Sequence, residues 1–322
     1  MNRFIQKGML ATLCIFVCCQ TANAEPTIDS VTLIEGATPE LVIRGSGFGP
    51  HPDFSASQSG FLAAGWHDFE NGNLEGGNVY RDSNGRSQWS VESASSRPGS
   101  RYHAQKVYIN NELGELAVDQ RGTTGDWYVS FWMHLNSPGE QQSGKFFRIY
   151  GDRSNVYVST GGGSLNVRGF SECGSCSPSP QTVWGSPQSF NGRTWHRVEV
   201  EISEQPDLFA IYLDGRLQWR RSSKLSGDER EQWIPNPFGG NGHTVGIGQM
   251  LDDPSRGYPT NGWYRFDDYY VSYTKARVEI SNEPTWAAAR RRELQVASQW
   301  SGQEVRAHFS EGALSSDPLY VY

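Results

Sequence analysis

The chain has 322 residues, of which 36% are hydrophobic and 12% aromatic, and its formal net charge is -7 at pH 7. This acidic balance argues against nucleic acid or an acidic membrane surface as partner, although it does not exclude an acidic glycan that meets a local basic patch. Runs of alternating apolar and polar residues are separated by Gly, Asn, Asp and Pro, with 36 glycines in all. The pattern predicts an all-β protein.

Residues 1–24 have the features of a secretory signal peptide: a basic start, an apolar stretch and a small-x-small end at Ala22 and Ala24. We expect cleavage after Ala24 and a secreted or periplasmic protein. A lipoprotein that uses Cys18 or Cys19 is the alternative. The apolar stretch is shorter than the roughly 20 residues that a spanning helix needs, so no membrane span is expected. Loss of the leader removes two positive charges, which changes the net charge from -7 to -9.

The mature chain keeps two of the five cysteines, Cys173 and Cys176 in "CGSC". In an oxidising compartment this pair is expected to form a small disulfide across a loop. A redox role would need a βαβ setting, and zinc would need two further ligands. Neither is visible in the Ser/Pro-rich surroundings.

The first strands end in "VIRGSGFGP", residues 42–50. A phosphate-binding loop would need a helix after the last glycine, but Pro50 and Pro52 prevent one, so a tight turn is expected. The stretch "PTIDSVTLIEGATPELVIRGSGFGP" resembles the start of an IPT/TIG domain, an immunoglobulin-like sandwich. The later strands of such a domain reappear in "ARVEISNEPTW", "RRRELQVASQWSGQEVRAHF" and "LYVY". We therefore predict that residues 25–53 and 276–322 form one split TIG-like sandwich.

Between these pieces, alternation predicts strands in "WYVSFWMHL", "FFRIY", "NVYVS", "WHRVEVEI", "LFAIYL", "HTVGIGQM" and "WYRFDDYYVSYT". In the first of them, Trp127, Val129, Phe131, Met133 and Leu135 should face the core. Asp214-Gly215 supplies a hairpin turn. The order of these phrases after "GWHDFENGNLEGG" resembles the concanavalin A-like lectin and glucanase superfamily. The resemblance implies that residues 54–275 are an antiparallel jelly roll, inserted into the TIG-like sandwich, with a concave face for ligands.

The outward-facing residues of these strands are the predicted glycan-binding set: Trp132, His134, Arg148, Tyr150, Tyr157, Arg197, Glu199 and Tyr212. Aromatic rings stack on sugar faces, and charged groups bind hydroxyls or a carboxylate. The alternative interpretation is a solvated or covered sheet face without a ligand. The leading functional prediction is a lectin-like protein that needs no cofactor.

A polysaccharide lyase is the main alternative, with Arg148 neutralising a uronic acid carboxylate, His134 as base, and Tyr150 or Tyr157 as proton donor. A glycosidase would show the glucanase pattern E-x-D-x-x-E, which is absent. A structural or adhesive surface protein is the third alternative. Calcium is a further expectation, because the acidic phrases "DFENGN" and "FDDYY" could meet if their strands pair. Its ligands would be Asp68, Glu70, Asp267 and Asp268.

Overall fold

The structure is a computed structural model, and it describes residues 26–49, 65–81, 88–107, 115–120, 127–135, 145–150, 155–161, 164–170, 183–184, 188–189, 194–204, 207–221, 243–250, 263–272, 274–314 and 318–322. Within these ranges every regular element is a β-strand. No helix in them is long and apolar enough to cross a membrane. The predicted all-β class is confirmed.

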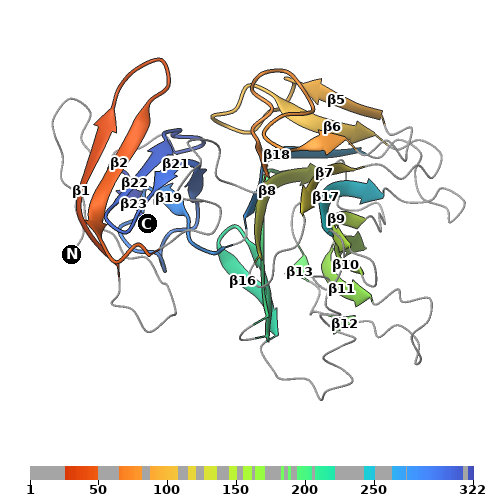
Figure 1. Cartoon of the computed structure of the whole chain (residues 1–322). Coiled ribbons are helices and arrows are strands. Elements are labelled where there is room, and N and C mark those ends of the chain that lie inside the picture. The colour runs from red at the N-terminus through yellow and green to blue at the C-terminus, as the bar shows by residue number, and fades with distance from the viewer. Residues whose placement is uncertain are drawn as a thin grey trace, which may run out of the picture.

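The two ends of the chain together form a small sandwich, shown at the left of Figure 1. One sheet has the order β1 (Thr27–Ile34), β2 (Glu40–Ser46), β22 (Glu304–His308) and β21 (Ala297–Trp300). The other has the order β20 (Glu293–Gln295), β19 (Val278–Ser281) and β23 (Tyr320–Val321). Strand β2 pairs with β22 so that Ile43 lies opposite Val305. Both residues belong to the core between the sheets, with Leu41, Ile280 and Val321.

The glycine-rich stretch lies at the end of β2. Gly47 and Gly49 have positive φ values of 75° and 69°, which glycine adopts without a steric penalty. Gly45 lies in β2 against the partner strand, and a Cβ there would lie 1.9 Å from the carbonyl oxygen of Thr27. Positive φ at both glycines is not the backbone of an opening α-helix, which a phosphate-binding loop would need.

A large sandwich of two antiparallel sheets lies between β2 and β19. We call the sheet beside the small sandwich the junction sheet. Its strand order is β16 (Arg216–Arg221), β15 (Asp207–Leu213), β14 (His196–Glu204), β8 (Trp127–Leu135), β18 (Trp263–Ser272), β6 (His103–Val107) and β5 (Gln88–Glu92). Strand β3 (Gly65–His67) also pairs with β18. The other, the distal sheet, has the order β12 (Val183–Trp184), β11 (Ser164–Phe170), β10 (Asn155–Gly161), β9 (Lys145–Tyr150), β17 (His243–Met250), β7 (Leu116–Gln120) and β4 (Tyr80–Arg81), with β13 (Gln188–Ser189) paired to β11.

One core fills the space between the two large sheets. Strand β8 contributes Trp127, Val129, Phe131 and Met133 to it, as the alternation predicts. Strands β7, β9 and β17 contribute residues such as Val118, Phe147 and Val245 from the distal sheet. Because side chains alternate along a strand, the intervening residues lie on the outer faces of the two sheets. The prediction of an antiparallel sandwich inserted into a smaller one is confirmed.

The hairpin turn at Asp214-Gly215 is present between β15 and β16. Both residues have positive φ, at 50° and 69°, as the twist of a two-residue hairpin requires. This turn also approaches the small sandwich, because a Cβ on Gly215 would lie 3.0 Å from Nη1 of Arg292. Glycine therefore serves both the turn and the contact between the sandwiches.

Candidate functional site

The predicted glycan-binding residues are divided between the two large sheets. The junction sheet carries Trp132, His134, Arg197, Glu199 and Tyr212, and the distal sheet carries Arg148, Tyr150 and Tyr157. Packed sheets lie about 10 Å apart with their outer faces pointing in opposite directions, so one sugar cannot touch both groups. The predicted lyase pair, His134 as base and Arg148 as neutralising group, consequently does not come together.

Two of the predicted residues belong to a buried group of ion pairs between the sandwiches. This arginine network consists of Arg197, Arg277, Arg292, Glu199 and Glu279. Glu279 pairs with Arg197, with Arg277 Nε at 3.1 Å and with Arg292 Nε at 2.9 Å. Glu199 Oε2 accepts a hydrogen bond from Arg292 Nη2 at 3.1 Å.

The arginine network covers part of the outer face of the junction sheet. Arg197 and Glu199 come from β14, whereas Glu279 lies on β19 of the small sandwich and Arg292 directly precedes β20. Arg197 is 3% exposed and Glu199 is 1% exposed. They point outward as predicted, but the small sandwich covers them, so this part of the face is not open to a glycan.

Electrostatics inside the network favour the charged form of Glu279. Burial alone would raise the pKa of this carboxyl group. The guanidinium groups of Arg197, Arg277 and Arg292 outweigh burial and hold the pKa well below its ordinary value. The charge of Glu279 is thus shared among three cations from both sides of the junction.

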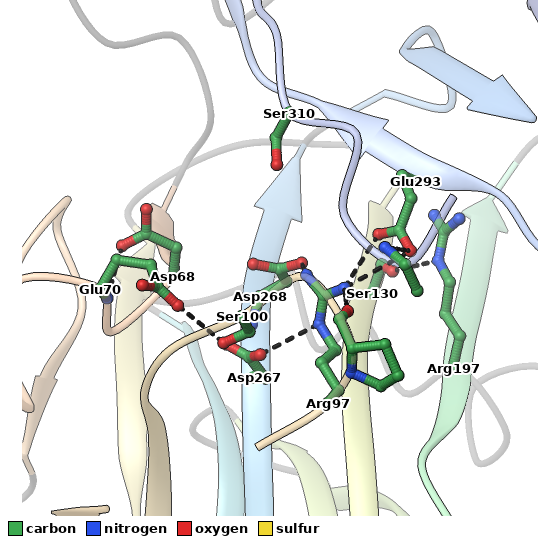
Figure 2. Close-up of polar contacts among 12 residues, drawn as sticks. Asp68, Glu70, Arg97, Ser100, Ser130, Arg197, Asp267, Asp268, Glu293 and Ser310 are labelled. Atoms are coloured by element: carbon green, nitrogen blue, oxygen red, sulfur yellow. Dashed lines mark hydrogen bonds and ion pairs between the residues drawn. The ribbon is translucent and has the colours of Figure 1, made fainter. Parts of the chain in front are cut away.

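Arg97 joins three carboxylates at the same junction (Figure 2). It also covers the ring of Trp132. Its Nε donates to Asp267 Oδ2 at 3.0 Å, its Nη2 pairs with Asp268, and its Nη1 lies 3.3 Å from Glu293 Oε2. The guanidinium carbon lies 5.1 Å from the centroid of the Trp132 ring. Trp132 is 8% exposed, so this predicted stacking residue is largely covered by Arg97.

The four carboxylates predicted to bind calcium lie beside this arginine (Figure 2): Asp68, Glu70, Asp267 and Asp268. The pKa of Asp268 is raised, chiefly by burial. The negative charges of Asp68 and Glu70 add to this increase, and the positive charge of Arg97 opposes it. Glu70 Oε1 already accepts a hydrogen bond from Ser100 Oγ at 2.7 Å. Within the described ranges, no group of three or more His, Cys, Asp or Glu side chains could hold a metal ion as it stands.

His134 and Tyr212 are the predicted junction-sheet residues that stay partly exposed. Tyr212 OH donates to Glu201 Oε2 at 3.3 Å, and burial together with Glu201 raises the pKa of Tyr212 to about 12. His134 stacks on Trp263, with ring centroids 5.2 Å apart and 18° between the planes. It also contacts Trp195 at a centroid distance of 5.5 Å. His134 therefore lies in an aromatic group rather than beside Tyr212.

On the distal sheet, strand register brings Arg148 beside Tyr157 on one side and Gly246 on the other. Gly246 in turn pairs with Ala117 on β7. The neighbours of these residues along β7, β9 and β17 belong to the core, so this row lies on the outer face. Strand register thus makes Arg148, which is partly exposed, a neighbour of Tyr157. The side chains of Tyr150 and Tyr157 lie outside what the structure describes.

Sequence reasoning does not identify Glu115, which lies beside this row. Its side chain is 1% exposed, and its carboxylate occupies the space above Gly246, where an added Cβ would lie 2.1 Å from Oε2. Because Gly246 pairs with Arg148, an acid and a base are neighbours on the outer face. The available signal was the alternation in "ELAVD", where Glu115 and Asp119 flank Ala117 on one face.

Cys173 and Cys176, the predicted disulfide, lie outside the described residues. The predicted signal peptide, residues 1–24, also lies outside them.

No family model matches the sequence, and no curated protein matches it significantly. Among solved structures, the chain is similar to a cellulose-induced protein, Cip1, with 14% identity, a TM-score of 0.48, and coverage of 65% of this chain and 97% of that chain. It is similar to a botulinum neurotoxin type C structure concerned with cell entry through two ganglioside molecules, with 14% identity, a TM-score of 0.41, and coverage of 59% and 43%. It is also similar to the binding domain of botulinum neurotoxin DC in complex with rat synaptotagmin II. The identity is 15%, the TM-score is 0.41, and the match covers 62% of this chain and 44% of that chain.

The chain therefore spans less than half the length of these toxin chains. With every one of these TM-scores below 0.5, the likenesses carry no argument about function, which rests on the geometry above.

Proposed function

We propose that this protein is an exported carbohydrate-binding protein that recognises a polysaccharide on the outer face of the distal sheet. The binding residues would be Arg148, Tyr150 and Tyr157. Their large sandwich would belong to the concanavalin A-like superfamily, and the small sandwich would be a split IPT/TIG domain.

The row that contains Arg148 is the observation that carries this proposal. In the row, Ala117 and Gly246 present almost no side chain next to a long cationic one. The Glu115 carboxylate fills the space above Gly246, and Ala117 is buried, so Arg148 is the partly exposed residue among these three. Its guanidinium would supply directional hydrogen bonds to hydroxyls or a carboxylate of a sugar, with the Glu115 carboxylate beneath it.

Replacing Arg148 by alanine should weaken glycan binding about tenfold or more. Loss of one charge-assisted hydrogen bond costs about 1.4 kcal/mol or more, and about 1.4 kcal/mol corresponds to a tenfold change in affinity. Neutral and uronic acid polysaccharides would be screened by retention and calorimetry with the wild type. Arg216→Ala is the matched control, since it removes an exposed arginine on β16 of the other sheet. Equal affinity of the wild type and Arg148→Ala for every glycan that is bound would refute this site.

A lyase is the second candidate, favoured by the direct pairing of Arg148 with Tyr157. In this alternative Arg148 would neutralise the carboxylate of a uronic acid, and a tyrosine of the same face would take the α-proton in place of His134. The ultraviolet absorbance of an unsaturated sugar end, formed during the same screen, distinguishes cleavage from binding. Retention without new absorbance supports the binding protein, and absorbance that persists in Tyr157→Phe argues against this lyase mechanism. If neither signal appears, a structural or adhesive role becomes the better explanation.

Calcium at Asp68, Glu70, Asp267 and Asp268 remains a separate proposal. Arg97 is one cation for Asp267, Asp268 and Glu293, so this region has an excess of negative charge that a hard cation would relieve. We expect millimolar calcium to raise the melting temperature of chelator-treated protein by several degrees, and Asp68→Asn to reduce that increase. An unchanged melting temperature would mean that Arg97 and protonation balance the carboxylates without a metal.

A further inference from the structure

A second arginine, Arg265, marks a separate surface on the outer face of the junction sheet, away from the arginine network. Register aligns residues from four strands in one row across this face: His134 on β8, Arg265 on β18, Gln105 on β6 and Ser90 on β5. Nε of Arg265 donates to Gln105 Oε1 at 2.8 Å, which fixes the direction of the guanidinium. The row is partly exposed at all four positions.

Arg265 differs from the arginines of the domain junction in having no carboxylate within ion-pair distance among the described residues. Arg97, Arg197 and Arg292 each pair with at least two carboxylates. Burial lowers the pKa of Arg265, and Glu92 raises it. A partly desolvated guanidinium without an acidic partner has unused capacity to bind an anion.

Aromatic rings form the sides of this surface. The guanidinium carbon of Arg265 lies 4.0 Å from the ring centroid of Trp263, and His134 stacks on the same ring. Trp195, which directly precedes β14, contacts His134, and its Nε1 donates to the carbonyl oxygen of Ser95 at 3.0 Å. Fixed aromatic rings beside a cationic donor are the combination that binds a charged sugar, because the rings contact its apolar face while the cation binds its charge.

A buried histidine contributes a second feature that points to a ligand. His103 is 0% exposed, its Nδ1 lies 3.1 Å from Ser96 Oγ, and its Nε2 has no hydrogen-bond partner within the described part of the chain. Burial is the main cause that lowers the pKa of His103 to about 4, and the nearby Arg265 and His134 lower it further. Glu92 on β5 lies opposite His103 in the strand register. The lowered pKa favours the neutral form of His103, which leaves Arg265 as the cationic group of this surface.

We propose that Arg265, with His134, Gln105, Trp195 and Trp263, forms a binding site for the anionic group of an acidic polysaccharide. The chemistry required is an oxyanion carried by a sugar, which a uronic acid carboxylate or a sulfate ester supplies. The site does not depend on glycan binding at Arg148, because the two arginines lie on opposite sheets. If both sites are occupied, one molecule holds two polysaccharide chains on opposite sides.

Dextran, carboxymethyl dextran and dextran sulfate test this site, because they share one backbone and differ in the anion. The protein is net acidic, with a formal charge of -7 for the whole chain, so general electrostatics oppose binding of either polyanion. We expect the wild type to bind at least one charged dextran and not the neutral one. Stronger binding of the carboxymethyl form identifies a carboxylate site, and stronger binding of the sulfate form identifies a sulfate site.

Arg265→Gln should weaken that binding about tenfold or more, and Arg265→Lys should restore only part of it, since lysine lacks the planar fork of donors. Arg216→Ala removes one exposed positive charge elsewhere and controls for net charge. Arg265→Gln is also measured in an Arg148→Ala background, where a further loss of charged-dextran binding belongs to this site and not to the distal one. Melting temperatures verify that each variant is folded. If Arg265→Gln does not fold, Trp263→Phe takes its place and should also weaken binding of the charged dextrans. Absence of binding to both charged dextrans, or equal binding by Arg265→Gln, would overturn the proposal.

Discussion

Replacing Glu279 by alanine is expected to lower the free energy of unfolding by about 3–5 kcal/mol, the usual cost of breaking a buried ion pair by removing one partner. Arg197, Arg277 and Arg292 would then share the single carboxylate of Glu199 inside the junction. The loss should appear as a lower urea midpoint. Unfolding of the two sandwiches at separate urea concentrations would locate the damage at their contact.

A surface glutamate of the small sandwich provides the control for this experiment. Glu304 pairs with Arg44 at 2.8 Å and with Arg306 at 2.9 Å, but these side chains are partly exposed, so Glu304→Ala should change the midpoint little. A Glu279→Ala protein with the wild-type midpoint would show that the buried network does not hold the sandwiches together.

The second large effect is expected at Gly99, in the turn that carries Arg97. Gly99 has a φ of +86°, and an added Cβ would lie 1.7 Å from the carbonyl oxygen of Gly312 in the small sandwich. Both the backbone conformation and the close approach therefore exclude a side chain. Gly99→Ala should lower the free energy of unfolding by at least about 2 kcal/mol, because either the strained backbone persists or the turn moves away.

Movement of this turn would also displace Arg97 from Asp267, Asp268 and Glu293, since Ser100 N donates to the carbonyl oxygen of Arg97 at 3.1 Å within the same turn. Gly302→Ala is the matched control, because nothing lies within 4 Å of a Cβ at Gly302. Urea unfolding of both variants measures the difference. Equal midpoints for the two variants would contradict the close contact between the turn and the small sandwich.

The sequence predicts the strands well because side-chain alternation is a local property. Strand β8 coincides with the predicted "WYVSFWMHL", and its apolar positions enter the core. Alternation does not tell which sheet a strand joins, since both sheets bury one face in the same core. His134 and Arg148 are both on outward positions for this reason, yet they lie on opposite sheets.

The burial of Arg197 could not be predicted from its own strand. Its partners Glu279 and Arg292 follow far later in the chain, and only the docking of the small sandwich brings them to β14. Glu279 alternates with the core residues Val278 and Ile280, so its outward position gives no local sign of this contact. Arg265 and Trp263 alternate with the core residues Tyr264 and Phe266, a pattern that a solvated strand face shares with a binding face.

The pairing of β2 with β22 determines when the small sandwich can be completed. Ile43 meets Val305 only after nearly the whole chain exists, and β1 with β2 alone is a two-stranded ribbon, which is marginally stable in water. During synthesis these first strands must wait with an open edge and apolar side chains while the large sandwich folds between them and their partner. Until β22 pairs with β2, the unpaired edge and its apolar side chains make the folding intermediate prone to aggregation.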